Sequence, residues 1–246
     1  MVDLHCHILP GVDDGAGDLA QALSMARLAW ESGTETIIAT PHCGLPGSPG
    51  NFWCGELAER FRALRRALRE EKIPIRLLPG MEFFAGEDLR DLWERQRLMP
   101  LAGSRYLLLE FFFDESGSYM DAVLEQAASC GLVPVVAHPE RYGSVQREPE
   151  RVERWFRRGY IMQANKGSIL GDLGAAAERT AWDLLEHGLI HAVASDAHSD
   201  TRRTPDLSRV RRRLERELGT GYASLLLEEN PGRIAADRSV CRSLPE

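Results

Sequence analysis

VDLHCHILPGVDD, residues 2–14, is the stretch that decides the fold of this chain. A short apolar run ends in two histidines, His5 and His7, that are separated by one residue. Side chains alternate along a strand, so residues two apart point the same way and both imidazoles can reach one ion. Cys6 then faces the opposite side and is expected to pack. The stretch therefore predicts a buried strand that ends in a pair of metal ligands.

Three further apolar runs end in the same kind of residue. His42 follows IIATP, His138 follows VVA, and Asp196 and His198 close the run VASDAH. Imidazole and carboxylate groups together are a ligand set for a divalent metal ion. Because these residues are scattered over most of the chain, the fold must bring them to one place.

Short apolar runs alternate with amphipathic stretches along the whole sequence. The runs predict strands at 2–5, 36–40, 75–79, 106–110, 133–137, 160–164 and 190–194. The stretches predict helices near 18–32, 56–71, 86–96, 118–130, 149–158, 174–187, 205–218 and 221–229, the last ending before Asn230-Pro231. Gly131, Gly159 and Gly188 each follow an expected helix, where a C-terminal cap belongs.

Seven strand–helix units with mostly apolar strands predict a parallel sheet that is buried on both faces. No glycine-rich phosphate fingerprint follows the first strand, which disfavours an open dinucleotide-binding sheet. A polar residue that could bind a ligand stands at the carboxyl end of every strand: His5 and His7, His42, Glu82, Glu110, His138, Asn165, and Asp196 with His198. Such ends converge on the rim of a barrel. We expect an α/β fold, a distorted seven-stranded parallel (β/α)7 TIM-like barrel that forms one domain over residues 1–246.

Composition excludes several classes of protein. The 246 residues are 43% hydrophobic and 27% charged, as in an ordinary globular domain, and the net charge of −7 argues against a nucleic-acid partner. No apolar run approaches the roughly 18 residues of a membrane span, and no secretory signal begins the chain. Five widely spaced cysteines, an odd number, suit a reduced cytoplasmic protein.

Cys54 and Arg60 have the C-x5-R spacing of thiol phosphatases. That chemistry needs a glycine-rich loop whose amides cradle phosphate, whereas Gly-Glu-Leu-Ala-Glu between them reads as the start of a helix. We therefore interpret the spacing as a coincidence. The loop at 43–55, which contains Phe52 and Trp53, is either a plain surface loop or an aromatic lip over the site.

The motifs resemble the polymerase and histidinol phosphatase (PHP) family of metal-dependent phosphoesterases. Within it, the chain is similar to the bacterial manganese-dependent tyrosine-protein phosphatases of capsule and exopolysaccharide synthesis. The resemblance is carried by DLHCHILPGVDDGA (3–16), TPH (40–42), GME (80–82), LLLEF (107–111), GLVPVVAHPERY (131–142), IMQANKGSILG (161–171) and SDAHSDTR (195–202) with Arg203. Because it begins at Asp3, we expect a stand-alone phosphatase domain.

The resemblance implies a site for three metal ions. It assigns His5, His7, Glu82 and Asp196 to the first ion, Glu82, Glu110 and His138 to the second, and Asp14, His42 and His198 to the third. Glu82 would bridge two ions, and Asp14 rather than Asp13 is chosen from the family pattern alone. The resemblance favours manganese, although iron, zinc and cobalt also suit oxygen and imidazole ligands.

A metal-activated hydroxide would attack phosphorus in line, without a covalent protein intermediate. Arg141 and Arg203 are the expected catalytic and phosphate-binding groups, because a guanidinium fork binds phosphate bidentately. Arg202 is a rival for the role given to Arg203. Asn165 would either support substrate binding or cap a backbone group. His187 and His191 are expected to be structural.

The leading hypothesis is a protein-tyrosine phosphatase whose partner is an autophosphorylating bacterial tyrosine kinase. A second hypothesis keeps the site and changes the substrate to a small phosphomonoester such as histidinol phosphate. A third is a metal-stabilised scaffold that binds a partner without catalysis. The complete set of expected ligands argues against the third.

Overall fold

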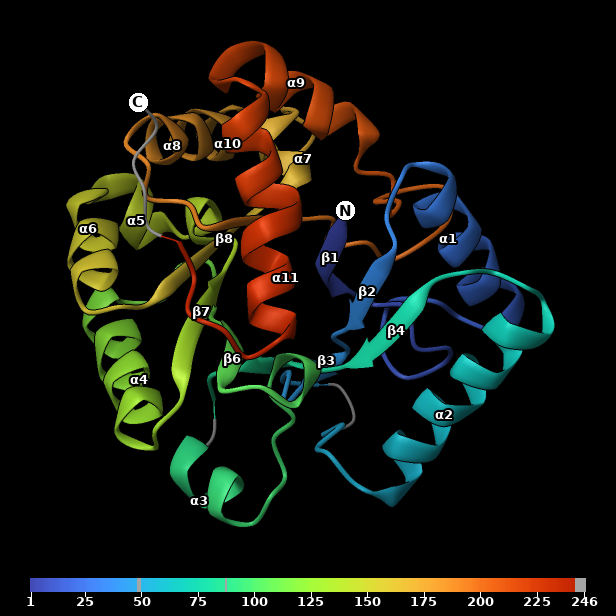
Figure 1. Ribbon diagram of the computed structural model, residues 1–246. Coiled ribbons are helices and arrows are strands. Elements are labelled where there is room, and N and C mark those ends of the chain that lie inside the picture. The colour runs from blue at the N-terminus through green and yellow to red at the C-terminus, as the bar shows by residue number, and fades with distance from the viewer. Residues whose placement is uncertain (48–49, 87, 242–246) are drawn as a thin grey trace.

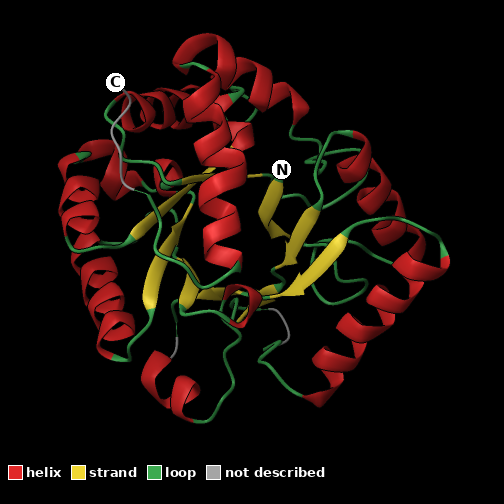
Figure 2. Ribbon diagram, viewed as in Figure 1, coloured by secondary structure: helices red, strands yellow, loops and turns green. Residues whose placement is uncertain are grey.

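Parallel strands alternate with helices along the chain, as Figures 1 and 2 show. The computed structural model describes residues 1–47, 50–86 and 88–241, so residues 48–49 of the expected loop, residue 87 of an expected helix and residues 242–246 of the expected domain lie outside it. The described strands are β1 (Val2–Cys6), β2 (Thr36–Ala39), β3 (His42–Cys43), β4 (Arg76–Pro79), β5 (Glu82–Phe84), β6 (Tyr106–Glu110), β7 (Val133–Ala137), β8 (Ile161–Asn165) and β9 (Ala192–Ala194).

The helices lie outside the strands and surround them (Figure 2). The α-helices are α1 (Leu19–Glu31), α2 (Gly55–Glu70), α3 (Leu89–Glu94), α4 (Gly117–Ser129), α5 (Gly143–Arg147), α6 (Glu150–Arg157), α7 (Lys166–Ile169), α8 (Ala175–Glu186), α9 (Ser208–Leu218), α10 (Thr220–Ser224) and α11 (Asn230–Ala235). Two 3-10 turns, η1 (Leu101–Gly103) and η2 (Pro139–Arg141), and a π-helical turn, η3 (Leu225–Glu229), complete the described elements. Gly131, Gly159 and Gly188 have positive φ after α4, α6 and α8, as expected of C-terminal caps.

The strands form two parallel sheets rather than one. The first has the order β1-β2-β4 and the second the order β3-β5-β6-β7-β8-β9. The break falls at Pro41, between β2 and β3, and at Gly80, between β4 and β5. Proline cannot donate to a ladder of hydrogen bonds. At Gly80 the neighbouring strands lie so close together that an added Cβ would be 2.8 Å from Ile38 Cγ2.

The expected α/β fold with parallel strands is confirmed. The expected closed seven-stranded barrel is not, because the strands form two sheets. Among the described residues the ladder does not close, because β1 pairs with the segment after β9 through an isolated bridge between Cys6 and Ala197. Hydrogen bonds from His7 N to Ala197 O and from Asp196 N to His5 O, both 2.9 Å, hold these two edges together.

The strand boundaries agree with the expected ones to within two residues. The strands expected at 106–110 and 133–137 have those bounds, and the others shift by one or two residues. The short strands β3 and β5 and the helices α5 and α7 were not expected. The prediction that a helix ends before Asn230-Pro231 is wrong. The chain stays helical into α11, with Pro231 in the first turn of that helix, where proline is tolerated.

The two ends of the strand assembly differ in character. At the amino end, Arg105 N donates to Asp237 Oδ1 at 3.0 Å and Tyr106 Oη donates to Arg238 O at 2.8 Å, so the segment after α11 covers the start of β6. An apolar cluster that includes Leu4, Leu108 and Ile234 fills the space between the strands and α11. The polar residues gather at the opposite, carboxyl end. Within the described residues, no helix combines the length and apolar character needed to cross a membrane.

Candidate metal centre

The carboxyl ends of the strands bring all nine expected metal ligands together. His5 lies on β1 and His7 just beyond it, His42 and Glu82 begin β3 and β5, Glu110 ends β6, His138 follows β7, and Asp196 and His198 follow β9. The ninth, Asp14, lies on the loop between β1 and α1. Eight of them are buried, and Asp14 alone is exposed.

Glu82 lies at the centre of the cluster. Its Oε2 is 3.2 Å from His5 Nε2, 3.3 Å from His7 Nε2 and 3.0 Å from His42 Nδ1. Its Oε1 is 3.2 Å from His138 Nε2. One buried carboxylate thus contacts four imidazoles that come from three different parts of the chain. This is the arrangement expected of a bridging ligand.

Glu110 and His138 stand on one side of Glu82. Glu110 Oε1 is 3.5 Å from His138 Nε2, and its Oε2 is 3.3 Å from His42 Nδ1. His138 has a left-handed backbone (φ 34°), as does Asp196 (φ 49°). Such a conformation is costly for residues other than glycine and is found mainly where a site requires it.

Asp196 and Asp14 contact the histidines on the other sides. Asp196 Oδ1 lies 3.6 Å from the Nε2 atoms of both His5 and His7. Asp14 Oδ1 lies 3.5 Å from the Nε2 atoms of both His42 and His198. His198 Nδ1 is 3.0 Å from Asp196 O, so its protonated nitrogen faces the backbone and its Nε2 lone pair faces the cluster.

Three groups have ligand atoms within 4.8 Å of one another: His7, Asp14, His42 and His198; His5, His7 and Asp196; and His42, Glu82 and Glu110. The grouping implied by the family resemblance overlaps with these but is not the same. His7 also joins the group of Asp14, and His42 stands with the two glutamates in place of His138. Glu82 is not grouped with His5, His7 and Asp196.

Two residues that orient the histidines were missed by the sequence analysis. Asp13 Oδ2 is 2.8 Å from His7 Nδ1 and accepts a hydrogen bond from His42 N at 2.8 Å. Gln163 Oε1 is 2.8 Å from His5 Nδ1. Partners of this kind fix the tautomer and the direction of a metal-binding imidazole. Proximity to Asp14 was the only sequence signal for Asp13, and Gln163 had none.

Unpaired polar atoms test whether the cluster suits a metal ion. Among the described residues, Glu82 Oε2, Glu110 Oε2 and His198 Nε2 are buried without a hydrogen-bond partner of acceptable geometry. Buried polar atoms are normally paired, since leaving one unpaired costs about 1–3 kcal/mol. These atoms are oxygen and imidazole donors that face one another, so the residues fit divalent cations.

Charges in the cluster are strongly coupled. Burial would lower the pKa of His42, but the carboxylates of Glu82 and Glu110 raise it to about 10. Burial would also lower the pKa of His138, and the same two glutamates raise it to about 9. Burial and the charge of His7 lower the pKa of His198 to about 3. Without cations, the buried carboxylates thus depend on protonated imidazoles for positive charge, which bound metal ions would supply instead.

Two arginines lie against Asp196, on the exposed side of the cluster. Arg203 Nη2 is 2.5 Å from Asp196 Oδ2, and Arg141 Nη1 is 3.6 Å from the same oxygen. Asn165 Nδ2 donates to that oxygen at 2.5 Å, while its Oδ1 accepts from Gly167 N. Asn165 therefore both caps α7 and contacts a candidate ligand. Arg202 lines a neighbouring cavity with Arg203 and Asn165.

A family model described as capsular polysaccharide synthesis, CpsB/CapC, matches residues 1–236. The chain belongs to the CpsB/CapC family. This confirms the resemblance seen in the sequence motifs, with which the PHP family is consistent.

Relatives in this family span nearly the full chain. Tyrosine-protein phosphatase YwqE of Bacillus subtilis (strain 168) is 36% identical over 249 residues, which covers 100% of this chain and 96% of YwqE. Tyrosine-protein phosphatase CpsB of Streptococcus pneumoniae is 28% identical over 247 residues, which covers 98% of this chain and 100% of CpsB.

Solved structures agree with this assignment. A structure from a study of YwqE from Bacillus subtilis and CpsB from Streptococcus pneumoniae, described as unique metal-dependent tyrosine phosphatases, matches with a TM-score of 0.92 at 34% identity. The match covers 100% of this chain and 98% of that one. A beta-aspartyl dipeptidase of Fervidobacterium islandicum AW-1 matches with a TM-score of 0.54 at 13% identity, which shows a shared fold alone.

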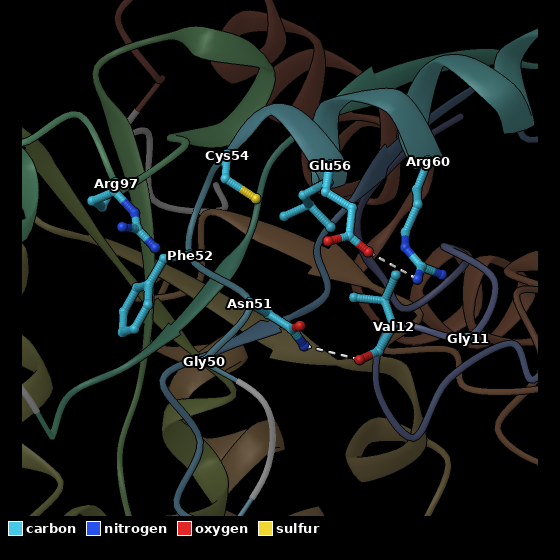
Figure 3. Close-up of a pocket in the computed structure, with 10 residues that line it drawn as sticks. Gly11, Val12, Gly50, Asn51, Phe52, Cys54, Glu56, Arg60 and Arg97 are labelled. Atoms are coloured by element: carbon cyan, nitrogen blue, oxygen red, sulfur yellow. Dashed lines mark hydrogen bonds and ion pairs between the residues drawn. The ribbon is translucent and has the colours of Figure 1, made fainter.

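Cys54 and Arg60 lie apart from these clustered ligands, on the wall of a cavity of about 480 Å³ (Figure 3). Cys54 immediately precedes α2, and Arg60 Nη2 donates to Glu56 Oε1 at 3.1 Å within that helix. The residues between them are helical, as expected, and offer no loop of amides for a phosphate. Asn51 Nδ2 donates to Val12 O at 2.9 Å (Figure 3), which ties the 43–55 loop to the residues before Asp13.

The two remaining histidines lie outside the cluster. His187 is exposed at the end of α8, where its Nδ1 is 2.7 Å from Asp183 O. His191 is buried beside β8, where its Nδ1 accepts from Met162 N at 3.1 Å. Both positions agree with the expected structural roles.

Proposed function

We propose that this protein is a metal-dependent phosphatase that hydrolyses phosphotyrosine in proteins. The observation that carries the proposal is the contact of Glu82 with four imidazoles, two of them shared with Glu110, beside an arginine pair. The activity named for YwqE and CpsB, with the matching structure described as metal-dependent, supports the same assignment.

The proposed ligands are the nine residues of the cluster. His5, His7, Glu82 and Asp196 would hold one ion, Glu82, Glu110 and His138 a second, and Asp14, His42 and His198 a third. The shared contacts of His7 and His42 support a compact cluster in which neighbouring ions lie close together. We propose manganese, and the donor set also accommodates iron, zinc or cobalt.

Bound cations would supply Lewis acidity and a water of lowered pKa. Arg141 and Arg203 would bind the phosphoryl oxygens, because both guanidinium groups lie at Asp196, on the edge of the cluster. Their positive charges would stabilise the charge that spreads over those oxygens in the transition state. Asn165 would orient Asp196, and through it the substrate-binding edge.

The leaving group favours an aryl ester. Tyrosine leaves with a pKa of about 10, well below that of an alkyl alcohol, so the reaction needs little help from a general acid. We propose an autophosphorylating bacterial tyrosine kinase of capsule or exopolysaccharide synthesis as the substrate protein. The family description and the names of YwqE and CpsB support this choice. Five free cysteines support a reducing compartment, the cytoplasm.

The decisive experiment measures phosphate release by the purified protein after chelation and reloading with Mn²⁺. We expect hydrolysis that depends on the metal and that prefers a phosphotyrosine peptide to histidinol phosphate. A large preference for histidinol phosphate would replace the proposed substrate with a small phosphomonoester. If protein with a full metal content hydrolyses no aryl phosphate, the chain is a metal-stabilised scaffold instead.

A second measurement separates the metal mechanism from a thiol mechanism. We expect Cys54→Ser to keep nearly all of its turnover, because Cys54 is exposed and belongs to none of the metal-binding groups. Loss of activity in Cys54→Ser with unchanged metal content would mean that the C-x5-R spacing is functional after all.

A further inference from the structure

An exposed aromatic ring lies beneath one of the two arginines. Phe113 lies three residues after Glu110, which is the last residue of β6. Of its surface, 47% is exposed. The guanidinium carbon of Arg141 lies 4.2 Å from the centre of its ring. At this distance the cation is attracted by the face of the ring, and a planar guanidinium stacks on it.

Little else holds the Arg141 side chain. Its nearest carboxylate oxygen is Asp196 Oδ2 at 3.6 Å, whereas Arg203 approaches the same atom to 2.5 Å. Among the described residues, no hydrogen bond from the Arg141 guanidinium to a protein group accompanies these contacts. The face of the ring, together with the looser contact to Asp196, therefore restricts where this long side chain can lie.

The backbone fixes the ring relative to the arginine. Gly143 N, two residues after Arg141, donates to Phe113 O at 2.8 Å. The ring also packs near His138 and Tyr142, at 6.0 and 6.2 Å between ring centres. These contacts tie Phe113 to the segment that carries Arg141, in spite of its exposure.

We infer that Phe113 is a positioning residue, which holds the guanidinium of Arg141 in the plane that receives the phosphoryl group of the substrate. An acidic partner would use N–H donors and cancel charge, but the face of a ring restricts the side chain and leaves its donors for phosphate. Restricting the side chain before binding reduces the rotamer entropy lost when phosphate is bound. The inference rests on the proposed function.

Phe112 provides a matched control. It is the neighbouring residue, it is 51% exposed, and its ring packs edge-on against Phe84 with 4.6 Å between centres. Phe112→Leu removes the same atoms as Phe113→Leu, from a ring that does not lie under Arg141.

The test measures the dissociation constant of inorganic phosphate by calorimetry on the Mn²⁺-loaded protein, and KM and kcat for a phosphotyrosine peptide. We expect Phe113→Leu to weaken phosphate binding about threefold to thirtyfold, the range of a cation–π contact. Phe113→Tyr keeps the ring and should stay within about twofold of the parent protein. Phe112→Leu should behave as the parent does. Phe113→Met, which lacks a ring face but fills the space, repeats the test if the leucine variant unfolds.

A double variant identifies the route of the effect. In an Arg141→Met background, Phe113→Leu should cause no further loss of phosphate affinity, because the group it positions is already gone. Equal effects of Phe112→Leu and Phe113→Leu, or additive losses in the double variant, would overturn the inference. Turnover of phosphotyrosine by the parent protein tests the proposed function separately, so the two failures are distinguishable.

Discussion

At the scale of single residues, the site depends on carboxylates that contact several imidazoles at once. Glu82 contacts His138 through Oε1 and three other histidines through Oε2, so each imidazole restricts the carboxylate for the rest. His138 holds this position with a left-handed backbone, and Arg141 N donates a hydrogen bond to its carbonyl oxygen at 3.0 Å. A local strain is thus offset by contacts within the cluster.

Removing one imidazole tests this arrangement. We expect His138→Ala to lose metal and to reduce turnover of a phosphotyrosine peptide at least about a hundredfold, because both glutamates lose a shared partner. The measurement is metal content by elemental analysis together with kcat. His187→Ala, at an exposed histidine outside the cluster, is the matched control and should match the parent. Equal activity of the two variants would remove His138 from the metal site.

A substitution at Asp13 tests whether this residue orients metal-binding groups, as distinct from stabilising the fold. Asp13→Ala leaves His7 Nδ1 and His42 N without their shared partner, so we expect metal affinity to fall about tenfold to a hundredfold. Asp18→Ala instead removes the carboxylate that caps α1 through Gln21 N, and should cost about 1 kcal/mol of stability without changing metal affinity. Metal titration and urea denaturation of both variants measure the two effects. If the two variants weaken metal binding equally, Asp13 has no orienting role.

At the scale of elements, Pro41 and Gly80 divide the strands and set the direction of the ligands. Each stands just before a short strand that begins with a ligand, His42 on β3 and Glu82 on β5. These two strands pair in parallel, with His42 opposite Glu82, and Glu82 N donates to Pro41 O at 3.1 Å. The break in the ladder therefore brings an imidazole and the central carboxylate into register.

The space at Gly80 predicts a cost for any side chain there. In Gly80→Ala the new Cβ would lie 2.8 Å from Ile38 Cγ2 and 3.3 Å from Ala39 O, so we expect a loss of about 1–3 kcal/mol in the free energy of unfolding. Gly232→Ala, inside α11 with nothing within 4 Å, should be neutral or slightly stabilising. Urea denaturation of both variants checks the difference, and equal stabilities would mean that β4 shifts to make room.

The sequence could predict where the ligands lie, but not where the sheet breaks. The expected ligands lie close together, because parallel strands with apolar runs must end at the same edge and most of the runs are followed by an imidazole or carboxylate. The sequence could not reveal the break at Gly80 or the open edge between Cys6 and Ala197, since both depend on how closely distant strands approach. Gln163 was missed for a similar reason: its role is defined by His5, 158 residues away.

At the scale of the whole molecule, the cluster joins parts of the chain that are far apart in the sequence. The proposed ligands come from β1, β3, β5 and β6 and from the segments after β7 and β9, and so include both sheets. The edges at β1 and β9 meet through an isolated bridge, two backbone hydrogen bonds and the contacts of Ser195 with Asp3, not through a continuous ladder. Cations bound at the cluster would therefore link the two sheets across the place where the ladder is open.

This linkage predicts that stability depends on metal. A ligand that binds only the folded state adds about 2.7 kcal/mol when its concentration is a hundred times its dissociation constant. We expect chelation to lower the midpoint of thermal unfolding by several degrees, and Mn²⁺ to restore it in the parent protein and in Cys54→Ser. In His138→Ala the response to Mn²⁺ should be much smaller, because a ligand of the cluster is gone. Scanning calorimetry measures all three proteins with and without the metal. Identical midpoints in every case would mean that the two sheets are held together by their packing alone.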